Sequence, residues 1–391
     1  IRRSVQLPRR DESGGAWYRL ARSVMRRPLV YVTVITIALL ALGAPFLRIS
    51  WGGTDARSLP AASTVRQVSQ TLDSQFPVNS TDPIEALITG ASGSAAVTSY
   101  LHRIDAIPGV TGTHVTAVKG DVTRVDVGYT PAPVSSAARH IVTQIRALAP
   151  PRIAPRTSPA LSSGATVLVG GTTAGLVDEL ASLGSVLPWM ALLVCVSTFV
   201  LLFLAFGSVV LPLKAIVMNV LSLGATFGVV VWIFQWGHLS GLLRFTPTGS
   251  IDPTMPILMA AVIFGLSMDY EVFLLSRIRE RYDQTGDNTV AVAAGLQRTG
   301  GVITSLALLL IIVVGAFSAS GITFIKLMGV GMIVALLVDA SVVRVLLVPA
   351  TMRLLGRANW WAPRPLRRLY ARYGFKEDSP APLAVPAGAR S

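Results

Sequence analysis

The sequence predicts an α-helical polytopic membrane protein with six transmembrane helices and a polar α+β domain after the first of them. Of its 391 residues, 52% are hydrophobic and only 14% are charged, and the mean hydropathy is +0.59. A soluble domain carries about 25% charged residues. Several uninterrupted apolar runs also reach the roughly 20 residues that a helix needs to cross a bilayer. Both observations indicate that lipid is part of the protein's solvent.

The apolar runs divide the chain into five parts. We expect a basic segment at 1–27, a first span at 28–47, a polar domain at 48–183, a five-helix bundle at 184–350 and a basic tail at 351–391. The Pro- and Ser-rich stretch 152–164 is expected to be a flexible connection, and the end of the tail to be disordered. The six expected spans are Pro28–Leu47, Ser185–Phe206, Val209–Phe234, Pro253–Leu275, Val302–Phe317 and Leu327–Ala350.

The arginines predict how the spans are oriented. Eight arginines precede the first span, four lie between 277 and 298, and six lie between 353 and 372. The short loops on the other side carry only Arg244, with Lys326 at a span edge. Cytoplasmic loops carry an excess of Lys and Arg. We therefore expect both termini in the cytoplasm, a multi-pass protein in the cytoplasmic (inner) membrane, and segment 48–183 outside it.

The polar domain has the pattern of an α+β unit. Runs rich in β-branched residues alternate with helical patterns, and Lys119-Gly-Asp121 is a tight-turn signal between two of the runs. The order β-α-β-β-α-β predicts a ferredoxin-like extracytoplasmic domain. The expected elements are a leading helix at Ser63–Phe76, strands at Ile84–Thr89, Val110–Val118, Val122–Tyr129 and Ala165–Val169, and helices at Ala95–Ala106 and Ser135–Leu148.

Composition also excludes several classes of function. The net charge of +14 suggests nucleic acid, but segment 48–183 is nearly neutral and the basic excess flanks the spans, as topology signals and contacts with anionic membrane lipids do. The four histidines show no ligand spacing, and the single Cys195 lies in an apolar run, so we expect no metal. No phosphate-binding loop or hydrolase motif is present. We expect no enzyme and no cofactor, with an ion gradient as the energy source.

The most informative residue is Asp269, in the middle of an apolar helix. Burying an ionised carboxylate there costs on the order of 3 kcal/mol on insertion scales. Such a group needs a partner, water or a proton, which favours a proton relay. A structural hydrogen bond between helices is the alternative interpretation. The neighbouring Tyr270 can donate a hydrogen bond to a carboxylate in another half of the protein.

Other polar residues in the last three spans are candidates for the same relay. Asp339 is a second intramembrane acid, and Arg344 lies five residues on, about 140° around an α-helix. The two side chains are therefore not expected to share a face, and either could pair with another helix, including Asp269. Glu271 is expected to reach toward Arg277 or water. The candidate supporting residues are Glu271, Ser267, Thr304 and Ser305, although hydrogen bonds between helices explain the last two equally well.

One segment resembles a known family signature. Gly265-Leu-Ser-Met-Asp-Tyr-Glu-Val-Phe-Leu-Leu-Ser-Arg277 closely resembles that of the mycobacterial membrane protein large (MMPL) family of the resistance-nodulation-division (RND) superfamily. The resemblance extends from Arg27 to Tyr373. Further similar segments are Val169-Gly-Gly-Thr-Thr-Ala174, Phe206-Gly-Ser-Val-Val-Leu-Pro212, Val338-Asp-Ala-Ser-Val-Val-Arg344 and Asn359-Trp-Trp-Ala-Pro363.

The resemblance implies a proton-driven exporter built from two similar halves. In this family each half has one span, an outer porter domain and five further spans, and the cargo is a lipid, siderophore or hydrophobic drug, chiefly in actinobacteria. This chain looks like the second half. Its expected partners are a lipid-like cargo, membrane lipids, and an N-terminal half or second protomer whose own Asp-Tyr pair would face Asp269 and Tyr270. Efflux of drugs or small toxins, and a membrane sensor or scaffold that transports nothing, are the alternatives.

Overall fold

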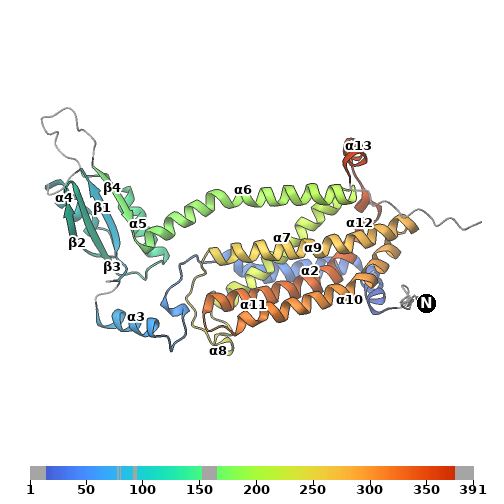
Figure 1. The fold of residues 1–391 in the computed structure, drawn as a ribbon, viewed down its shortest axis with the longest axis horizontal. Helices are drawn as coiled ribbons and strands as arrows, with labels where there is room; N and C mark the ends of the chain where they lie inside the picture. Colours follow the sequence, from blue (N-terminus) through green and yellow to red (C-terminus); the bar gives the residue numbers. More distant parts are fainter. Residues whose placement is uncertain (1–14, 77–78, 80, 91–94, 152–164, 375–391) are drawn as a thin grey trace, which may run out of the picture.

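The computed structural model describes residues 15–76, 79, 81–90, 95–151 and 165–374. The expectations for segment 152–164, for the first half of segment 1–27 and for the end of the tail lie outside these residues. In Figure 1 a bundle of long helices lies beside the single long helix α6, and a small sheet domain stands at one end. Six helices in the described part are long and apolar enough to cross a membrane, which confirms the prediction of a polytopic helical membrane protein.

The sheet domain contains the strands and helices that the sequence predicts, within two residues at each end. Four antiparallel strands lie in the order β2-β3-β1-β4, so the two strands that are central in space come from different parts of the segment. A leading helix, α3 (Thr64–Gln75), precedes them. The elements are β1 (Ile84–Thr89), α4 (Ala95–Asp105), β2 (Val110–Lys119), β3 (Val122–Tyr129), α5 (Ser136–Ala147) and β4 (Thr166–Gly170).

One face of the sheet carries the core of this domain. Val125, Val127 and Tyr129 alternate along β3 and are fully buried, as the two-residue period of a half-buried strand requires. They pack against Tyr100 of α4 and Ile145 of α5. The two helices therefore cover one face of the sheet.

The bundle contains most of the remaining helices. Its apolar core joins α2, α7, α9 and α10 with the end of the last long helix. The elements are α1 (Ala16–Arg26), α2 (Pro28–Gly43), α7 (Val210–Val230) followed by a π-helical turn (Val231–Gln235), α8 (Ser240–Leu243), α9 (Thr254–Thr285), α10 (Asn288–Gly315), α11 (Thr323–Leu337), a π-helix (Val338–Leu347), α12 (Val348–Leu355) and α13 (Arg364–Tyr373).

Two helices of the bundle, α9 and α10, run well past the apolar spans predicted for them. The helix α9 continues to Thr285 and ends at Gly286, whose φ of +65° suits glycine. The helix α10 begins at Asn288 because the side chain of Asp287 accepts hydrogen bonds from two backbone amides of its first turn. Hydropathy reports only the part of a helix that lipid surrounds, so it cannot locate ends that lie in polar surroundings.

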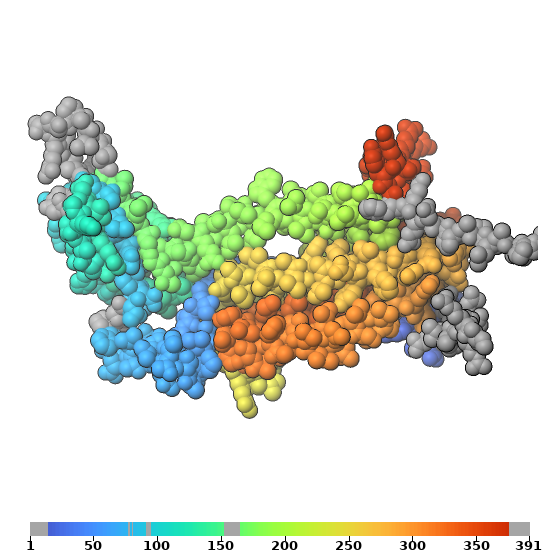
Figure 2. Space-filling view, in the orientation of Figure 1, coloured from blue at the N-terminus to red at the C-terminus, as the bar shows by residue number. Residues whose placement is uncertain are grey.

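The helix α6 (Thr172–Phe206) connects the two parts of the molecule. It is continuous across residues 183 and 184, where the sequence suggested a domain boundary. Figure 2 shows it running along the flank of the bundle. Its large apolar side chains are widely exposed, with Trp189 at 71% and Leu193 at 70%. Lipid or another protein must cover this surface in a membrane.

The helices α2 and α7 approach each other closely at one glycine. A Cβ atom built on Gly228 would lie 1.9 Å from the carbonyl oxygen of Leu42, which is shorter than any van der Waals contact. Small residues let the backbones of membrane helices meet in this way. The first span is thereby held against the bundle.

Candidate functional site

A buried polar cluster lies among the apolar helices, where α7, α9 and the π-helix meet. Asp339 and Arg344 of the π-helix are 4% and 2% exposed, and Ser267 of α9 and Asn219 of α7 are 4% and 3% exposed. Burying a polar group without a hydrogen bond costs about 2–7 kcal/mol, depending on the reference state. We call these four residues the central polar cluster, because hydrogen bonds join all of them.

An ion pair within the π-helix forms the centre of this cluster. The Nη2 atom of Arg344 lies 2.9 Å from Oδ2 of Asp339, and its Nε atom donates to the same oxygen at 3.0 Å. The expectation that these two side chains lie on different faces was wrong. It assumed an α-helix, whereas the i→i+5 hydrogen bonds of a π-helix bring residues five apart onto one face.

Ser267 connects this ion pair to the neighbouring helix. Its hydroxyl lies 3.0 Å from Oδ1 of Asp339 and 2.5 Å from the side-chain oxygen of Asn219. One hydroxyl proton cannot serve both acceptors, and Nδ2 of Asn219 is buried without a partner among the described residues. Turning the amide of Asn219 by 180° resolves both points, since Nδ2 then donates to Ser267 and Ser267 donates to Asp339. Arg344 also donates to the backbone oxygen of Ser267.

Asp269 and Tyr270 point to different sides of α9. Tyr270 is 8% exposed, and its ring lies against Arg344, with 5.0 Å between the guanidinium carbon and the ring centroid. Asp269 is exposed and forms no hydrogen bond or ion pair with any described residue. Along the same face of α9, Gly265 and Val272 are exposed too. The chain therefore leaves Asp269 uncovered on an apolar face while Tyr270 contacts the central polar cluster.

Glu271 does not reach toward Arg277 or water, and that expectation was wrong. The Glu271 side chain is only 6% exposed, and Arg277 pairs with Glu280 at 2.8 Å instead. The opposite charges that act on Glu271 are those of Lys214 of α7, itself 9% exposed, and of Arg344. Neither Glu271 Oε1 nor Lys214 Nζ has a hydrogen-bond partner among the described residues. A buried acid and a buried base thus lie beside the central polar cluster.

The structure does not bring Thr304 or Ser305 into this cluster. Both are exposed on α10, and the hydroxyl of Thr304 donates to the backbone oxygen of Gly300 in its own helix at 2.8 Å. The Thr304 hydroxyl therefore bonds within α10, which is neither the polar path nor the bond between helices that the sequence suggested. The structure assigns no partner to the side chain of Ser305 within the residues it covers.

Two residues of the site were missed by the sequence reasoning. Asn219 and Lys214 lie in a segment that was treated only as an apolar span. The signal was present, because a lysine and an asparagine five residues apart are rare inside a membrane helix. Neither is acidic, so the signal of a carboxylate in an apolar helix does not point to them.

The site gathers ionisable groups inside the helix bundle. It contains carboxylates, a guanidinium, an ammonium group and hydroxyls in apolar surroundings, where intramembrane ionisable groups mark proton or ion pathways. In the described residues no group of three or more His, Cys, Asp or Glu side chains could hold a metal ion.

The chain is similar to a family of membrane transporters over nearly its whole length. The model of the MMPL family matches residues 55–381. Putative membrane protein SCO6666 of Streptomyces coelicolor is 41% identical, over 97% of this chain and 51% of the relative. Trehalose monomycolate exporter MmpL3 of Mycobacterium tuberculosis is 37% identical over 94% of this chain and 39% of its own. Heme uptake protein MmpL11 of the same organism is 34% identical over 97% and 39%. The chain thus spans about half the length of these relatives, or less.

Proposed function

Because the chain belongs to the MMPL family of membrane transporters, we propose that it forms one half of a proton-driven exporter of lipids or lipid-like hydrophobic molecules. The observation that carries the proposal is the central polar cluster, an ion pair fully enclosed by helices that otherwise face lipid. A related protein named for trehalose monomycolate export supports a lipid-like cargo. No enzymatic step is part of the proposal.

Asp269 is the proton carrier in this proposal, and Tyr270 connects it to the cluster. The two residues are adjacent on α9. A change of charge at Asp269 therefore changes the electrostatic potential at the Tyr270 side chain, and a movement of Asp269 shifts the backbone of Tyr270. Tyr270 in turn lies against Arg344, which is held by Asp339. Protonation of Asp269 removes a negative charge beside this group, and the pairing of Arg344 can then shift between Asp339 and the ring of Tyr270. Helix packing would follow, because α7, α9 and the π-helix share the cluster.

A second half would complete the site. The face of α9 that carries Asp269 is apolar apart from this carboxylate and lacks a neighbour in the described chain. An ionised carboxylate facing lipid is unfavourable by several kcal/mol. We propose that the N-terminal half or a second protomer covers this face and supplies the donor that Asp269 lacks.

The sheet domain serves as the porter domain in this proposal. Its element order and its strand order β2-β3-β1-β4 support the ferredoxin-like interpretation. With both termini cytoplasmic, as the arginines predict, this domain stands outside the inner membrane. It would receive cargo from the outer leaflet and pass it onward when the helices move.

Substitution of Asp269 by asparagine tests the proposal. The amide side chain has nearly the shape of the native one but cannot carry a proton, so transport should be abolished while the protein still inserts into the membrane. The assay compares export of the cell's own envelope lipids in the Asp269→Asn strain with the wild type. Glu280→Gln is the matched control, because it removes an exposed acid from the same helix. Undiminished export by the Asp269→Asn strain would refute the relay.

Two further measurements separate the alternatives. Efflux of drugs or small toxins predicts that deletion raises drug sensitivity and leaves the outer lipids unchanged, whereas lipid export predicts depletion of an envelope lipid from the outer face. A sensor or scaffold should work unchanged when an uncoupler collapses the proton gradient. A relative named for heme uptake makes the direction of movement a third quantity to measure.

A further inference from the structure

Two segments of chain join the sheet domain to the bundle. One is α6, which leaves the sheet domain after β4. The other is the segment 48–54, which follows the first span and leads toward α3. We call this segment the linker. In Figure 1 the blue chain that follows α2 passes between the ends of the bundle helices and α3.

Gln235, the last residue of the π-helical turn after α7, holds the start of the linker. Its side-chain oxygen accepts a hydrogen bond from the backbone nitrogen of Ser50 at 2.8 Å, and its side-chain nitrogen donates to the backbone oxygen of Arg48 at 2.9 Å. Gln235 is only 8% exposed. Removing its amide would leave two backbone groups of the linker without these partners, which is costly in buried surroundings. The end of α7 is therefore firmly attached to the linker.

The start of α9 holds the next residues of the linker. The backbone nitrogen of Ile251 donates to the oxygen of Ser50 at 2.9 Å, and the nitrogen of Gly52 donates to the oxygen of Ile251 at 3.1 Å. One carboxylate oxygen of Asp252 accepts a hydrogen bond from the first backbone amide of α9 at 2.9 Å. The other oxygen accepts from the hydroxyl of Thr54 at 3.0 Å. The same carboxylate thus binds both α9 and the linker.

The linker also contacts the sheet domain, at Val134 between β3 and α5. A Cβ atom built on Gly53 would lie 2.9 Å from Cγ1 of Val134, and one built on Gly52 would collide with the side chain of Ser250. Val134 is 8% exposed, and its φ is +60°, which a β-branched residue rarely adopts. Such strain persists only where the surroundings fix the backbone. The two glycines therefore let the linker pack closely against both parts of the molecule.

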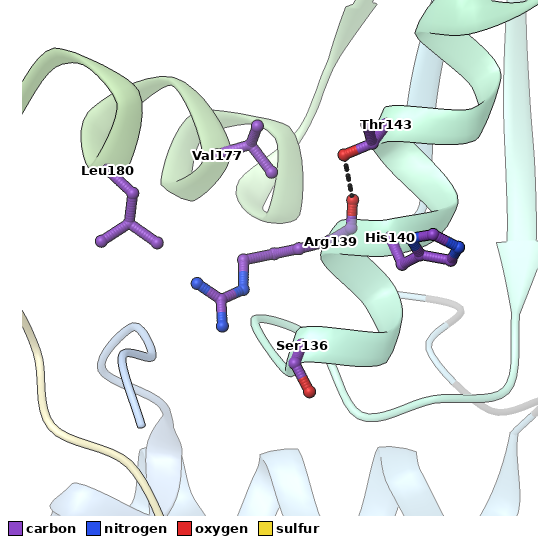
Figure 3. Close-up of a pocket in the computed structure, with 6 residues that line it drawn as sticks. All are labelled: Ser136, Arg139, His140, Thr143, Val177 and Leu180. Carbon is purple, nitrogen blue, oxygen red and sulfur yellow. Dashed lines mark hydrogen bonds between the residues drawn. The ribbon is translucent and has the colours of Figure 1, made fainter. Parts of the chain in front are cut away.

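The other connection, α6, can bend. Its first turns are attached to the sheet domain by the ion pair of Asp178 with Arg146 of α5, at 2.5 Å. Figure 3 shows α5 and α6 facing each other across a pocket of about 300 Å³, with Arg139 extending toward α6. Pro188 lies inside α6 and removes a backbone hydrogen bond, which favours a kink. Trp189 beside it is 71% exposed, so the bundle does not hold this part of α6.

We infer that the linker transmits displacements of α7 and α9 to the sheet domain, with Gln235 and Asp252 as positioning residues. Both helices contribute to the central polar cluster, and closely packed interiors transmit strain. The hydrogen bonds of Gln235 and Asp252 carry a shift of the helices to the linker, and the contact of Gly53 with Val134 carries it to the sheet domain. The role in transport rests on the proposed function, whereas the physical link can be measured without transport.

The first experiment measures the link in the full chain in lipid nanodiscs, with no proton gradient. Spin labels on Ala117→Cys in β2 and Leu242→Cys in α8, both at exposed positions, report the distance between the sheet domain and the bundle once Cys195→Ala has removed the native thiol. Pulsed electron resonance should give one narrow distance distribution. Gln235→Leu should broaden it, because both hydrogen bonds to the linker are lost. Gln70→Leu, which changes an exposed amide of α3, is the control and should leave the distribution unchanged.

Val134→Gly separates the link from the stability of the sheet domain. Glycine adopts a φ of +60° without strain, so the domain should unfold at the same temperature or a higher one. The contact with Gly53 is lost, however, so the distance distribution should broaden and export of envelope lipids by the complete transporter should be lost. A residue that only supports the fold would not show this combination.

A disulfide restores the contact in a controlled way. A Cβ atom on Gly53 would lie 3.5 Å from Cβ of Val134, within the range for a disulfide. The double variant Gly53→Cys with Val134→Cys should therefore export lipids when oxidised, because the linker and the sheet domain move together. Gly53→Cys alone is the control for the added side chain. Loss of export on oxidation, reversed by a reductant, would mean that this contact must open and would overturn the inference.

Two further results would overturn it. Unchanged distance distributions in Gln235→Leu and Val134→Gly would show that the linker does not hold the sheet domain. Broadened distributions with undiminished export would show that the link carries no motion needed for transport. Undiminished export by Asp269→Asn, in contrast, refutes the relay and has no bearing on the distance distributions, so the two failures are distinguishable.

Discussion

The ion pair between Asp339 and Arg344 allows a quantitative test of the site, through the variants Asp339→Leu and Arg344→Leu and their combination. Both residues are less than 5% exposed, and Nη2 of Arg344 lies 2.9 Å from Oδ2 of Asp339. Removing one partner from a buried pair leaves an uncompensated charge and is destabilising by about 3–5 kcal/mol. Each single variant should therefore lower the free energy of unfolding by roughly that amount.

The double variant should behave very differently. Replacing a buried ion pair by apolar residues of similar volume is often neutral or stabilising. The double variant loses the contact between Arg344 and Tyr270, worth about 1 kcal/mol, while Ser267 keeps its hydrogen bond to Asn219. We expect it to be more stable than either single variant, with a coupling energy above about 2 kcal/mol.

Unfolding in mixed detergent micelles, followed by helical circular dichroism, measures all four free energies. The expected result depends on the π-helix, because the pair can form only where residues five apart share a face. If the effects of the two single variants add in the double variant to within about 0.5 kcal/mol, the side chains do not interact. Asp339 and Arg344 would then not form the ion pair at the centre of the central polar cluster.

The remaining predictions concern other parts of the molecule. Asp269→Asn, at an exposed position without a partner, should change the free energy of unfolding by less than about 1 kcal/mol in the same assay, and a larger loss would mean that Asp269 is structural. Gly228→Ala should destabilise the contact between α2 and α7 by several kcal/mol or prevent folding, because its Cβ would collide with the Leu42 carbonyl, whereas Gly224→Ala, with open space around it, should be neutral within about 0.5 kcal/mol. Burial raises the pKa of Tyr129 in the sheet domain above its ordinary value; the neutral phenol is therefore favoured in the folded state, and its stabilising contribution is complete below about pH 10 and lost as the pH rises through the folded-state pKa. Tyr129→Phe should weaken the dependence of the domain's stability on pH above 10 in thermal unfolding, and an unaltered pH profile would contradict the assignment.

Local patterns in the sequence were sufficient to predict the six membrane spans and the strands of the sheet domain. Runs of β-branched residues bounded by turn signals located all four strands, because these residue types favour the extended backbone. Long apolar runs located the six spans, since the bilayer sets their minimum length. The same runs identified Asp269 and Asp339 as intramembrane acids, because a charged residue within an apolar run can be recognised without knowledge of the fold.

Only the tertiary structure decided which of these polar residues meet. Glu271 lies only two residues from Asp269 in sequence, yet it is buried while Asp269 stays exposed, because residues two apart on an α-helix point about 200° apart. The pairing of Asp339 with Arg344 depends on a π-helix, which changes the period that the sequence argument assumed. Asn219 and Lys214 join the site through packing of α7 against α9. Contacts of this kind depend on how distant segments face each other, and no local period in the sequence encodes that.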